Sequence, residues 1–129
     1  AVTDITGFGL LGHLSELCRA SGVSAEVWFD QLPLLPGAAE LVQQGVVPGG
    51  TKRNLEYASA WVEFDDGLAE WQRLLAADAQ TSGGLLLALP AGSLEAAVAA
   101  LTARGTLAAA VIGRIHSAQP ALISLRSTA

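Results

Sequence analysis

The chain has 129 residues, a formal net charge of −5 at pH 7 and 51% hydrophobic residues. A chain of this size and apolar content buries one core, so a single domain is expected over residues 1–129. Its seven basic residues form no patch able to neutralise a run of phosphates, so nucleic acid is not an expected partner. No apolar run approaches the ~20 residues of a membrane span, and one cysteine, Cys18, allows no internal disulfide. We therefore expect a cytoplasmic protein that does not bind membranes.

The opening segment, residues 3–9, carries an acid, two threonines and two glycines directly before an amphipathic pattern. Leucines recur there at helical spacing, so a helix should begin near Gly9. The first N–H groups of a helix lack internal partners and attract anions, and Asp4 offers the hard oxygen that magnesium prefers. A purely structural alternative is that Thr6 caps the helix while Asp4 stabilises its dipole.

The next elements are a strand and a short helix. Gly22 should end the first helix, because glycine favours the left-handed conformation of a helix C-terminus. Residues 23–29 alternate between apolar and polar side chains, which predicts a half-buried strand. A helix is predicted over residues 34–45, with Pro36 in its first turn and Gly45 at its end. Its inward-facing side chains should be Ala38, Leu41 and Val42.

A second polar segment, residues 48–54, combines two glycines, a threonine, an asparagine and the only lysine. It either forms a second anion-binding loop or lets Thr51 cap a helix over residues 52–58. An aromatic strand around residue 64 and a turn at 65–67 follow. The two aspartates of that turn fit the start of a helix over residues 68–77 better than a metal site.

The third polar segment, residues 78–84, ends in two glycines and precedes the apolar run 85–89, which is typical of a central buried strand. These glycines either let the backbone line a ligand site or form a tight turn. A helix should then run from a Ser93 cap to Arg104, with Leu94, Val98 and Leu101 facing inward. Strands over residues 107–116 and 121–126 are predicted to form a hairpin.

The two histidines and the cysteine do not have the spacing of a zinc site. His13 is placed one turn into the first helix, beside the opening segment. His116 is expected on the surface at the rim of the hairpin, and Cys18 is expected as a packed thiol. The order of elements indicates an α+β domain with a mixed β-sheet covered by helices.

The joint occurrence of the three polar segments closely resembles the C-terminal domain of the selenophosphate synthetase family. The residues that carry the resemblance are Thr3-Asp4-Ile5-Thr6-Gly7-Phe8-Gly9-Leu10-Leu11-Gly12-His13, Leu34-Leu35-Pro36-Gly37-Ala38 with Pro48-Gly49-Gly50-Thr51-Lys52-Arg53-Asn54, and Gln80-Thr81-Ser82-Gly83-Gly84-Leu85-Leu86. The likeness covers essentially the whole chain, and the first motif is shared more loosely across the aminoimidazole ribonucleotide synthetase superfamily. Ala79 departs from the family, which usually has proline there, so a looser turn is expected before Gln80 and Thr81.

The resemblance implies an ATP-dependent, magnesium-using enzyme that makes selenophosphate, AMP and phosphate from selenide, ATP and water. It implies three α/β/α layers, with the nucleotide between this domain and an N-terminal domain. Because the sequence has no methionine and opens on Ala1, we expect it to be the C-terminal half of such a two-domain protein. Dimerisation is expected mainly through the N-terminal half.

Carried over residue by residue, the resemblance assigns Asp4 to magnesium and polar loop residues to ATP, with no catalytic residue in this chain. The expected nucleotide-binding residues are Thr3, Thr6, Gly7, Gly9, Thr51, Asn54, Thr81, Ser82, Gly83 and Gly84. One carboxylate cannot hold magnesium alone, so the isolated chain should not turn over ATP. The alternatives are another ATP-using member of the superfamily, such as thiamine-monophosphate kinase or a purine-pathway synthetase, and a non-catalytic binding or assembly module.

Overall fold

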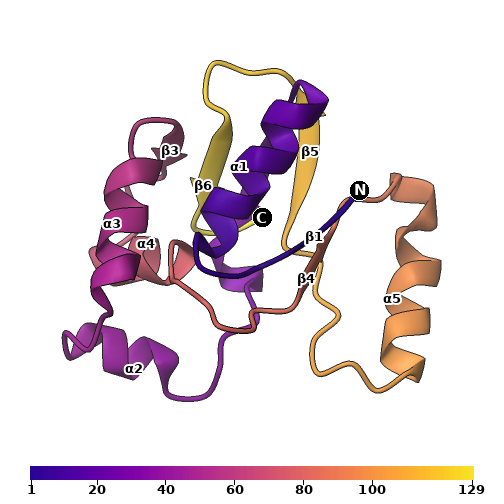
Figure 1. Cartoon of the computed structure of the whole chain (residues 1–129). Helices are drawn as coiled ribbons and strands as arrows, with labels where there is room; N and C mark the ends of the chain where they lie inside the picture. Colours follow the sequence, from indigo (N-terminus) through magenta and orange to yellow (C-terminus); the bar gives the residue numbers. More distant parts are fainter.

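The computed structural model describes all residues, 1–129, as six strands, five α-helices and two short 3-10 helices (Figure 1). In chain order these are β1 (Val2–Asp4), α1 (Gly9–Ser21), β2 (Val23–Trp28), η1 (Phe29–Gln31), α2 (Ala38–Gln43), α3 (Gly49–Ala58), β3 (Val62–Phe64), α4 (Glu70–Ala76), β4 (Leu85–Leu87), η2 (Ala91–Ser93), α5 (Leu94–Ala103), β5 (Gly113–Ser117) and β6 (Ile123–Arg126). The strands form a four-stranded sheet and a separate two-stranded ribbon.

The four-stranded sheet has the order β3-β6-β2-β5 and is mixed. Strand β6 runs parallel to both β2 and β3, whereas β5 is antiparallel to β2. The hairpin prediction is therefore wrong, because β2 lies between β5 and β6 and satisfies hydrogen-bonding groups on both of its sides. Ser24 of β2 helps to fix the chain that crosses from β5 to β6, since its hydroxyl accepts a hydrogen bond of 2.8 Å from the Gln119 amide.

The hydrophobic core lies between one face of this sheet and helices α1, α3 and α4. Alternate residues of β2 and β6 point into it, as the pleat of a strand requires. Its buried members on these two strands and on α1 are Ala25, Val27, Ile123, Leu125, Leu11, Leu14 and Cys18. The predicted α+β class, with a mixed sheet covered by helices, is confirmed, and Cys18 is the packed thiol that the sequence indicates.

Helix α1 begins at Gly9 and is followed by Gly22, as predicted from the sequence. Gly22 has a φ of 63°, and its amide donates to the carbonyl oxygen of Arg19. Gly9 has a φ of 70°, and a Cβ atom there would lie 2.7 Å from the carbonyl oxygens of Ala77 and Asp78. The residue that opens α1 is therefore glycine, because the backbone at the start of the third polar segment lies too close for a side chain.

Helices α2 and α3 differ from their predicted extents. Helix α2 covers only Ala38–Gln43, because Gly37 and Gly45 adopt left-handed conformations on either side of it. Leu41 is 50% exposed, so its predicted inward orientation is wrong. Helix α3 already begins at Gly49, which places Thr51 inside the helix and rules it out as the N-cap.

The apolar run after the third polar segment forms a peripheral ribbon. Strand β4 pairs antiparallel with β1 alone, with Asp4 opposite Leu85. Leu85 is 69% exposed, so the prediction of a central buried strand is wrong. The prediction failed because an apolar run does not show how many neighbours a strand has. Strand β4 has one neighbour, and Leu85 and Leu87 stay accessible.

Helix α5 stands apart from the sheet, at the side of the β1–β4 ribbon (Figure 1). None of its residues is buried, so the inward packing predicted for Leu94, Val98 and Leu101 is wrong in this chain. Ser93 occupies the N-cap position, but its side chain makes no capping hydrogen bond. The chain contains no helix with the length and apolar character needed to cross a membrane.

Candidate functional site

The opening polar segment, residues 3–9, is joined to the third, residues 78–84, by backbone hydrogen bonds. The Ile5 amide donates to the Gly84 carbonyl and the Ile5 carbonyl accepts from the Gly83 amide, both at 2.9 Å. A Cβ atom on Gly83 would lie 2.7 Å from the Ile5 carbonyl oxygen. The glycines of the third segment are thus needed where the two segments meet.

Asn54 joins the second polar segment to the opening segment and to the residue directly before the third, while Thr51 contacts the third segment itself. Its Nδ2 donates to the carbonyl oxygen of Gly7 at 2.9 Å and to that of Ala77 at 3.1 Å. One side chain of α3 therefore holds the turn before α1 and the end of α4 together. The structure thus brings together all three polar segments that the sequence singled out.

Asp78 completes this contact, although sequence reasoning did not single it out. Its Oδ1 accepts a hydrogen bond of 2.5 Å from the Thr51 hydroxyl, and its Oδ2 accepts one of 2.9 Å from Gln80 Nε2. The Thr51 oxygen also accepts from the Ala79 amide at 3.1 Å, and Thr51 is only 1% exposed. The Thr51 side chain therefore has internal partners in this structure, as does that of Asn54, and nucleotide contacts by these two residues stay predictions.

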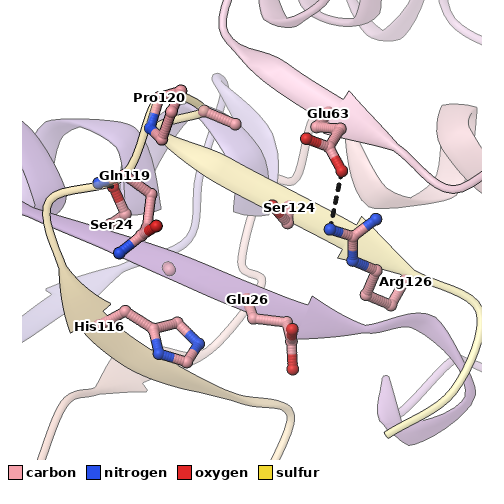
Figure 2. A pocket seen from close by; sticks show the side chains of 10 residues that line it. Ser24, Glu26, Glu63, His116, Gln119, Pro120, Ser124 and Arg126 are labelled. Carbon is pink, nitrogen blue, oxygen red and sulfur yellow. Dashed lines mark hydrogen bonds and ion pairs between the residues drawn. The ribbon is translucent and has the colours of Figure 1, made fainter.

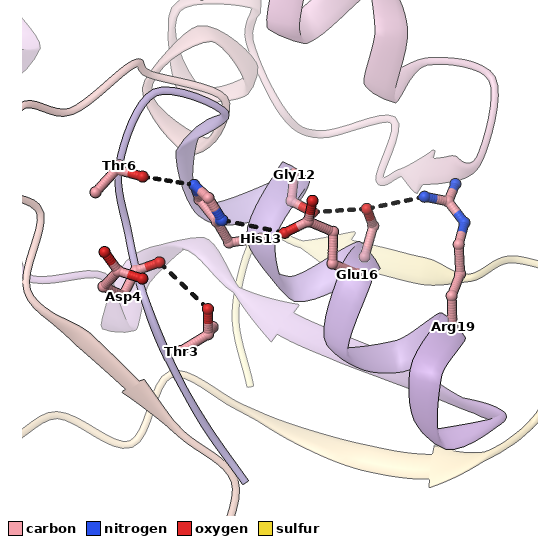
Figure 3. A network of polar contacts seen from close by, with 8 residues as sticks. Thr3, Asp4, Thr6, Gly12, His13, Glu16 and Arg19 are labelled. Atoms are coloured by element: carbon pink, nitrogen blue, oxygen red, sulfur yellow. Dashed lines mark hydrogen bonds and ion pairs between the residues drawn. The ribbon is translucent and has the colours of Figure 1, made fainter.

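Asp4 lies at the end of β1 with its carboxylate exposed. The carboxylate makes no hydrogen bond or ion pair within the chain; only its backbone carbonyl accepts a long contact of 3.5 Å from the Thr3 hydroxyl (Figure 3). An exposed carboxylate with no protein partner fits the hard oxygen ligand of a magnesium ion. No group of three or more His, Cys, Asp and Glu side chains could hold a metal ion. Magnesium binding by Asp4 stays a prediction.

His13 lies beside the opening segment, as its position in the sequence predicts. Its Nε2 is 3.0 Å from the Thr6 hydroxyl oxygen, and its Nδ1 is 3.3 Å from Glu16 Oε2 (Figure 3). Phe8 occupies the N-cap position of α1, and no side chain caps the helix. The capping role considered for Thr6 is therefore wrong. Sequence reasoning missed Glu16, although its spacing of three residues from His13 places both on one helix face.

Among the remaining predicted ligand residues, those at the tip of the third segment are accessible, whereas Gly9 is buried. Thr81, Ser82 and Gly84 are exposed, and Gly84 has a φ of 86° that favours glycine. The side chains of Thr81 and Ser82 make no hydrogen bonds within the chain. Their contacts with a nucleotide stay predictions, as do those of Thr3, Gly7 and Gly9.

A second polar region lies on the face of the four-stranded sheet opposite the core. A hollow of about 370 Å³ there is lined by residues from all four strands and the crossing segment (Figure 2). Its charges are paired: Arg126 Nη2 is 2.7 Å from Glu63 Oε1, and Arg114 Nε is 3.3 Å from Glu26 Oε1. His116, predicted at the surface, is half-buried in its wall. None of the lining residues belongs to the three polar segments, so this hollow is separate from the candidate site.

Comparison with known families places the chain in a class. Residues 1–122 match the family described as AIR synthase related protein, C-terminal domain. The chain belongs to this family. The match covers every element from β1 to β5 and includes all three polar segments.

Individual relatives give a more specific likeness. The chain is 48% identical over 119 residues to the selenide, water dikinase of Cronobacter sakazakii, covering 92% of this chain and 33% of that protein. It is 50% identical over 96 residues to the selenide, water dikinase of a Sulfurovum species, covering 74% of this chain and 27% of that protein. A protein of the same name from Myxococcus xanthus is 43% identical over 122 residues, 95% of this chain and 34% of the relative. The chain thus spans about a third of the length of the curated relatives that it matches.

Proposed function

We propose that this chain is the C-terminal domain of a selenide, water dikinase, an ATP-dependent enzyme that makes selenophosphate from selenide, ATP and water with release of AMP and phosphate. The observation that carries the proposal is the identity of 42–50% to proteins of that name over most of this chain. The exposed, unpaired carboxylate of Asp4 next to a glycine-rich turn supports it.

The proposed role of the chain follows from the chemistry of phosphoryl transfer. This chemistry depends on positioning and charge neutralisation more than on a protein nucleophile. Asp4 would hold a magnesium ion that, when bound, neutralises charge on the nucleotide phosphates. The exposed backbone of the opening and third segments would bind the phosphates, because glycines let backbone N–H groups approach an anion closely.

The rest of the protein would supply what this chain does not contain. We propose an N-terminal domain that contributes the other metal ligands and the reactive groups, in a cytoplasmic enzyme that dimerises through that domain. The length of the relatives, about three times that of the matched region, supports a larger protein. The isolated chain should then bind no catalytic magnesium and consume no ATP.

The first test replaces Asp4 in the full-length protein. Asp4→Asn removes the charge but keeps the shape, and we expect it to lower selenide-dependent kcat/KM by about 100-fold, since even indirect partners of a metal are worth 10–100-fold. Asp66→Asn is the matched control, because Asp66 is also exposed and lies outside the three polar segments. Equal activity of the two variants would show that Asp4 does not hold the magnesium ion.

A second test addresses the substrate, because the family shared with AIR synthase includes other ATP-using enzymes. ATP consumption by the full-length protein is measured with selenide, with thiamine monophosphate and with a purine-pathway ribonucleotide as alternative acceptors. We expect only selenide to stimulate it. Stimulation by a different acceptor would reassign the enzyme within its superfamily, and no stimulation by any acceptor would favour a binding or assembly module.

A further inference from the structure

Three polar side chains form a hydrogen-bonded row from the opening segment into α1. The Thr6 hydroxyl is 3.0 Å from His13 Nε2, and Glu16 Oε2 is 3.3 Å from His13 Nδ1 (Figure 3). The His13 side chain is 11% exposed, whereas that of Glu16 is 61% exposed. The Phe8 ring lies 5.7 Å from the imidazole, centroid to centroid. The imidazole is therefore held by a contact at each of its two nitrogens, and the Phe8 ring lies beside it.

The order of donors along this row follows from the chemistry of its ends. A carboxylate can only accept hydrogen bonds, so in the neutral imidazole the proton must sit on Nδ1, facing Glu16. Nε2 is then an acceptor, and the Thr6 hydroxyl must donate its only proton to it. What remains on the Thr6 oxygen is acceptor capacity alone.

We propose that His13, oriented by Glu16, is a positioning residue that fixes the Thr6 oxygen as a hydrogen-bond acceptor toward the ligand of the opening segment. This inference rests on the proposed function, in which that segment binds magnesium-nucleotide. It changes the expected role of Thr6, because an acceptor oxygen does not bind a bare phosphate oxygen. It binds a group that carries protons, such as a water molecule held by a divalent cation, and leaves the phosphates to backbone N–H groups.

The arrangement resembles the way in which proteins orient residues around a metal. Partners that do not touch the ion fix the tautomer and direction of the groups that do, and their loss typically costs 10–100-fold in metal affinity or activity. Glu16, His13 and Thr6 would act in this way on the water around the cation that Asp4 holds. None of the three needs to touch the ion.

The first test reads the tautomer directly and involves no activity. The chain has only two histidines, so ¹⁵N-histidine labelling gives two rings, and His116→Gln assigns them. At a pH where both rings are neutral, we expect His13 to carry its proton on Nδ1. Glu16→Ala should move that proton to Nε2, while Glu56→Ala, an exposed change on α3, should leave it in place. A proton on Nε2 in the unaltered chain would overturn the proposal.

The second test uses the magnesium dependence of the full-length protein, with whichever acceptor drives ATP consumption. Thr6→Val and His13→Ala should each raise the magnesium concentration for half-maximal activity by about 10-fold. Thr6→Ser keeps the hydroxyl, so its magnesium requirement should stay within about two-fold of that of the unaltered protein. The double variant should be no worse than either single variant, because both act through one oxygen. Additive effects, or an unchanged magnesium requirement, would overturn the proposal.

The two tests separate this inference from the proposed function. A protein that uses an acceptor other than selenide but shows the Nδ1 tautomer and coupled Thr6 and His13 effects would refute the proposed substrate and support the positioning role. A selenide-dependent enzyme with the Nε2 tautomer and uncoupled effects would do the opposite. If any variant unfolds, the tautomer of His13 in the unaltered chain still tests the positioning role.

Discussion

At the scale of single residues, Asp65 anchors the end of the last strand. Its Oδ2 accepts hydrogen bonds from the Ser127 amide at 3.2 Å and the Ser127 hydroxyl at 3.0 Å. The Ser127 backbone bond, followed by the Ser127 side-chain bond, lowers the pKa of the Asp65 carboxyl below its ordinary value. The charged form is therefore favoured more in the folded chain than in the unfolded chain.

This pKa shift predicts how stability depends on pH. A carboxyl with a lowered folded-state pKa adds stability above its unfolded pKa of about 4 and loses that stability as the pH falls through the lower folded value. Asp65→Asn should therefore reduce the free energy of unfolding at pH 7, with a difference from the unaltered chain that shrinks below about pH 4. Urea unfolding followed by tryptophan fluorescence measures this, with Asp66→Asn as control. A difference that stays constant down to pH 2 would contradict the assignment.

Cys18 gives a second prediction at this scale. Burial raises the pKa of its thiol above the ordinary value, and the nearby Arg19 charge lowers it by less. The side chain is fully buried, so the reactive thiolate is both scarce and inaccessible. We expect Ellman's reagent to release no colour with the native chain at neutral pH and one equivalent after unfolding in urea. Prompt reaction of the native chain would show that the first helix packs differently.

At the scale of elements, the network around Thr51 fixes α3 to the third polar segment. Its hydroxyl donates to Asp78 and accepts from the Ala79 amide. The resemblance to the selenophosphate synthetase family implies proline at the position of Ala79, so the alanine predicts a looser turn there. The structure shows that the Ala79 amide makes a hydrogen bond that proline cannot make.

Removing this hydroxyl tests the network. Thr51→Val keeps the size and branching of the side chain but leaves Asp78 Oδ1 and the Ala79 amide without their partner. Each of these two hydrogen bonds is worth about 0.5–1.5 kcal/mol, so we expect a loss of about 1–3 kcal/mol in the free energy of unfolding. Thr102→Val is the matched control, because Thr102 is an exposed threonine inside α5. Urea unfolding of both variants decides, and equal losses would mean that the buried hydroxyl contributes nothing specific.

Elements with a strong local signal were predictable from the sequence. The leucine spacing before Gly22 gave α1, and the alternation over residues 23–29 gave β2 with nearly correct bounds. The hairpin and the buried strand over residues 85–89 failed because strand order depends on partners far away in the chain, and local apolar runs do not identify these partners. The three polar segments were found from composition. The hydrogen bond between Thr51 and Asp78 could not be, since it joins residues far apart in the chain. The contact between His13 and Glu16 lies within one helix, so its spacing of three residues was a usable signal.

At the scale of the whole molecule, packing is uneven. Helix α1 contributes five buried residues, whereas α5 contributes none and lies beside a ribbon in which Leu85 and Leu87 are exposed. An isolated helix of ten residues is marginal in water, because most helical stability in proteins comes from packing of an apolar face. The two helices should therefore differ in local stability.

Hydrogen exchange of the isolated chain tests this contrast. Opening α5 exposes no buried core, so its amides should exchange at low free energies of opening, while those of α1 should exchange only through an opening close to global unfolding. We expect α5 to be deuterated well before α1 in a mass-spectrometric time course. Repeating the time course in the full-length protein shows whether any part outside this chain covers α5 and the β1–β4 ribbon. Such cover would slow exchange in these elements without any change in α1. Equal protection of α5 and α1 in the isolated chain would contradict the idea that packing, and not sequence propensity, sets the stability of these helices.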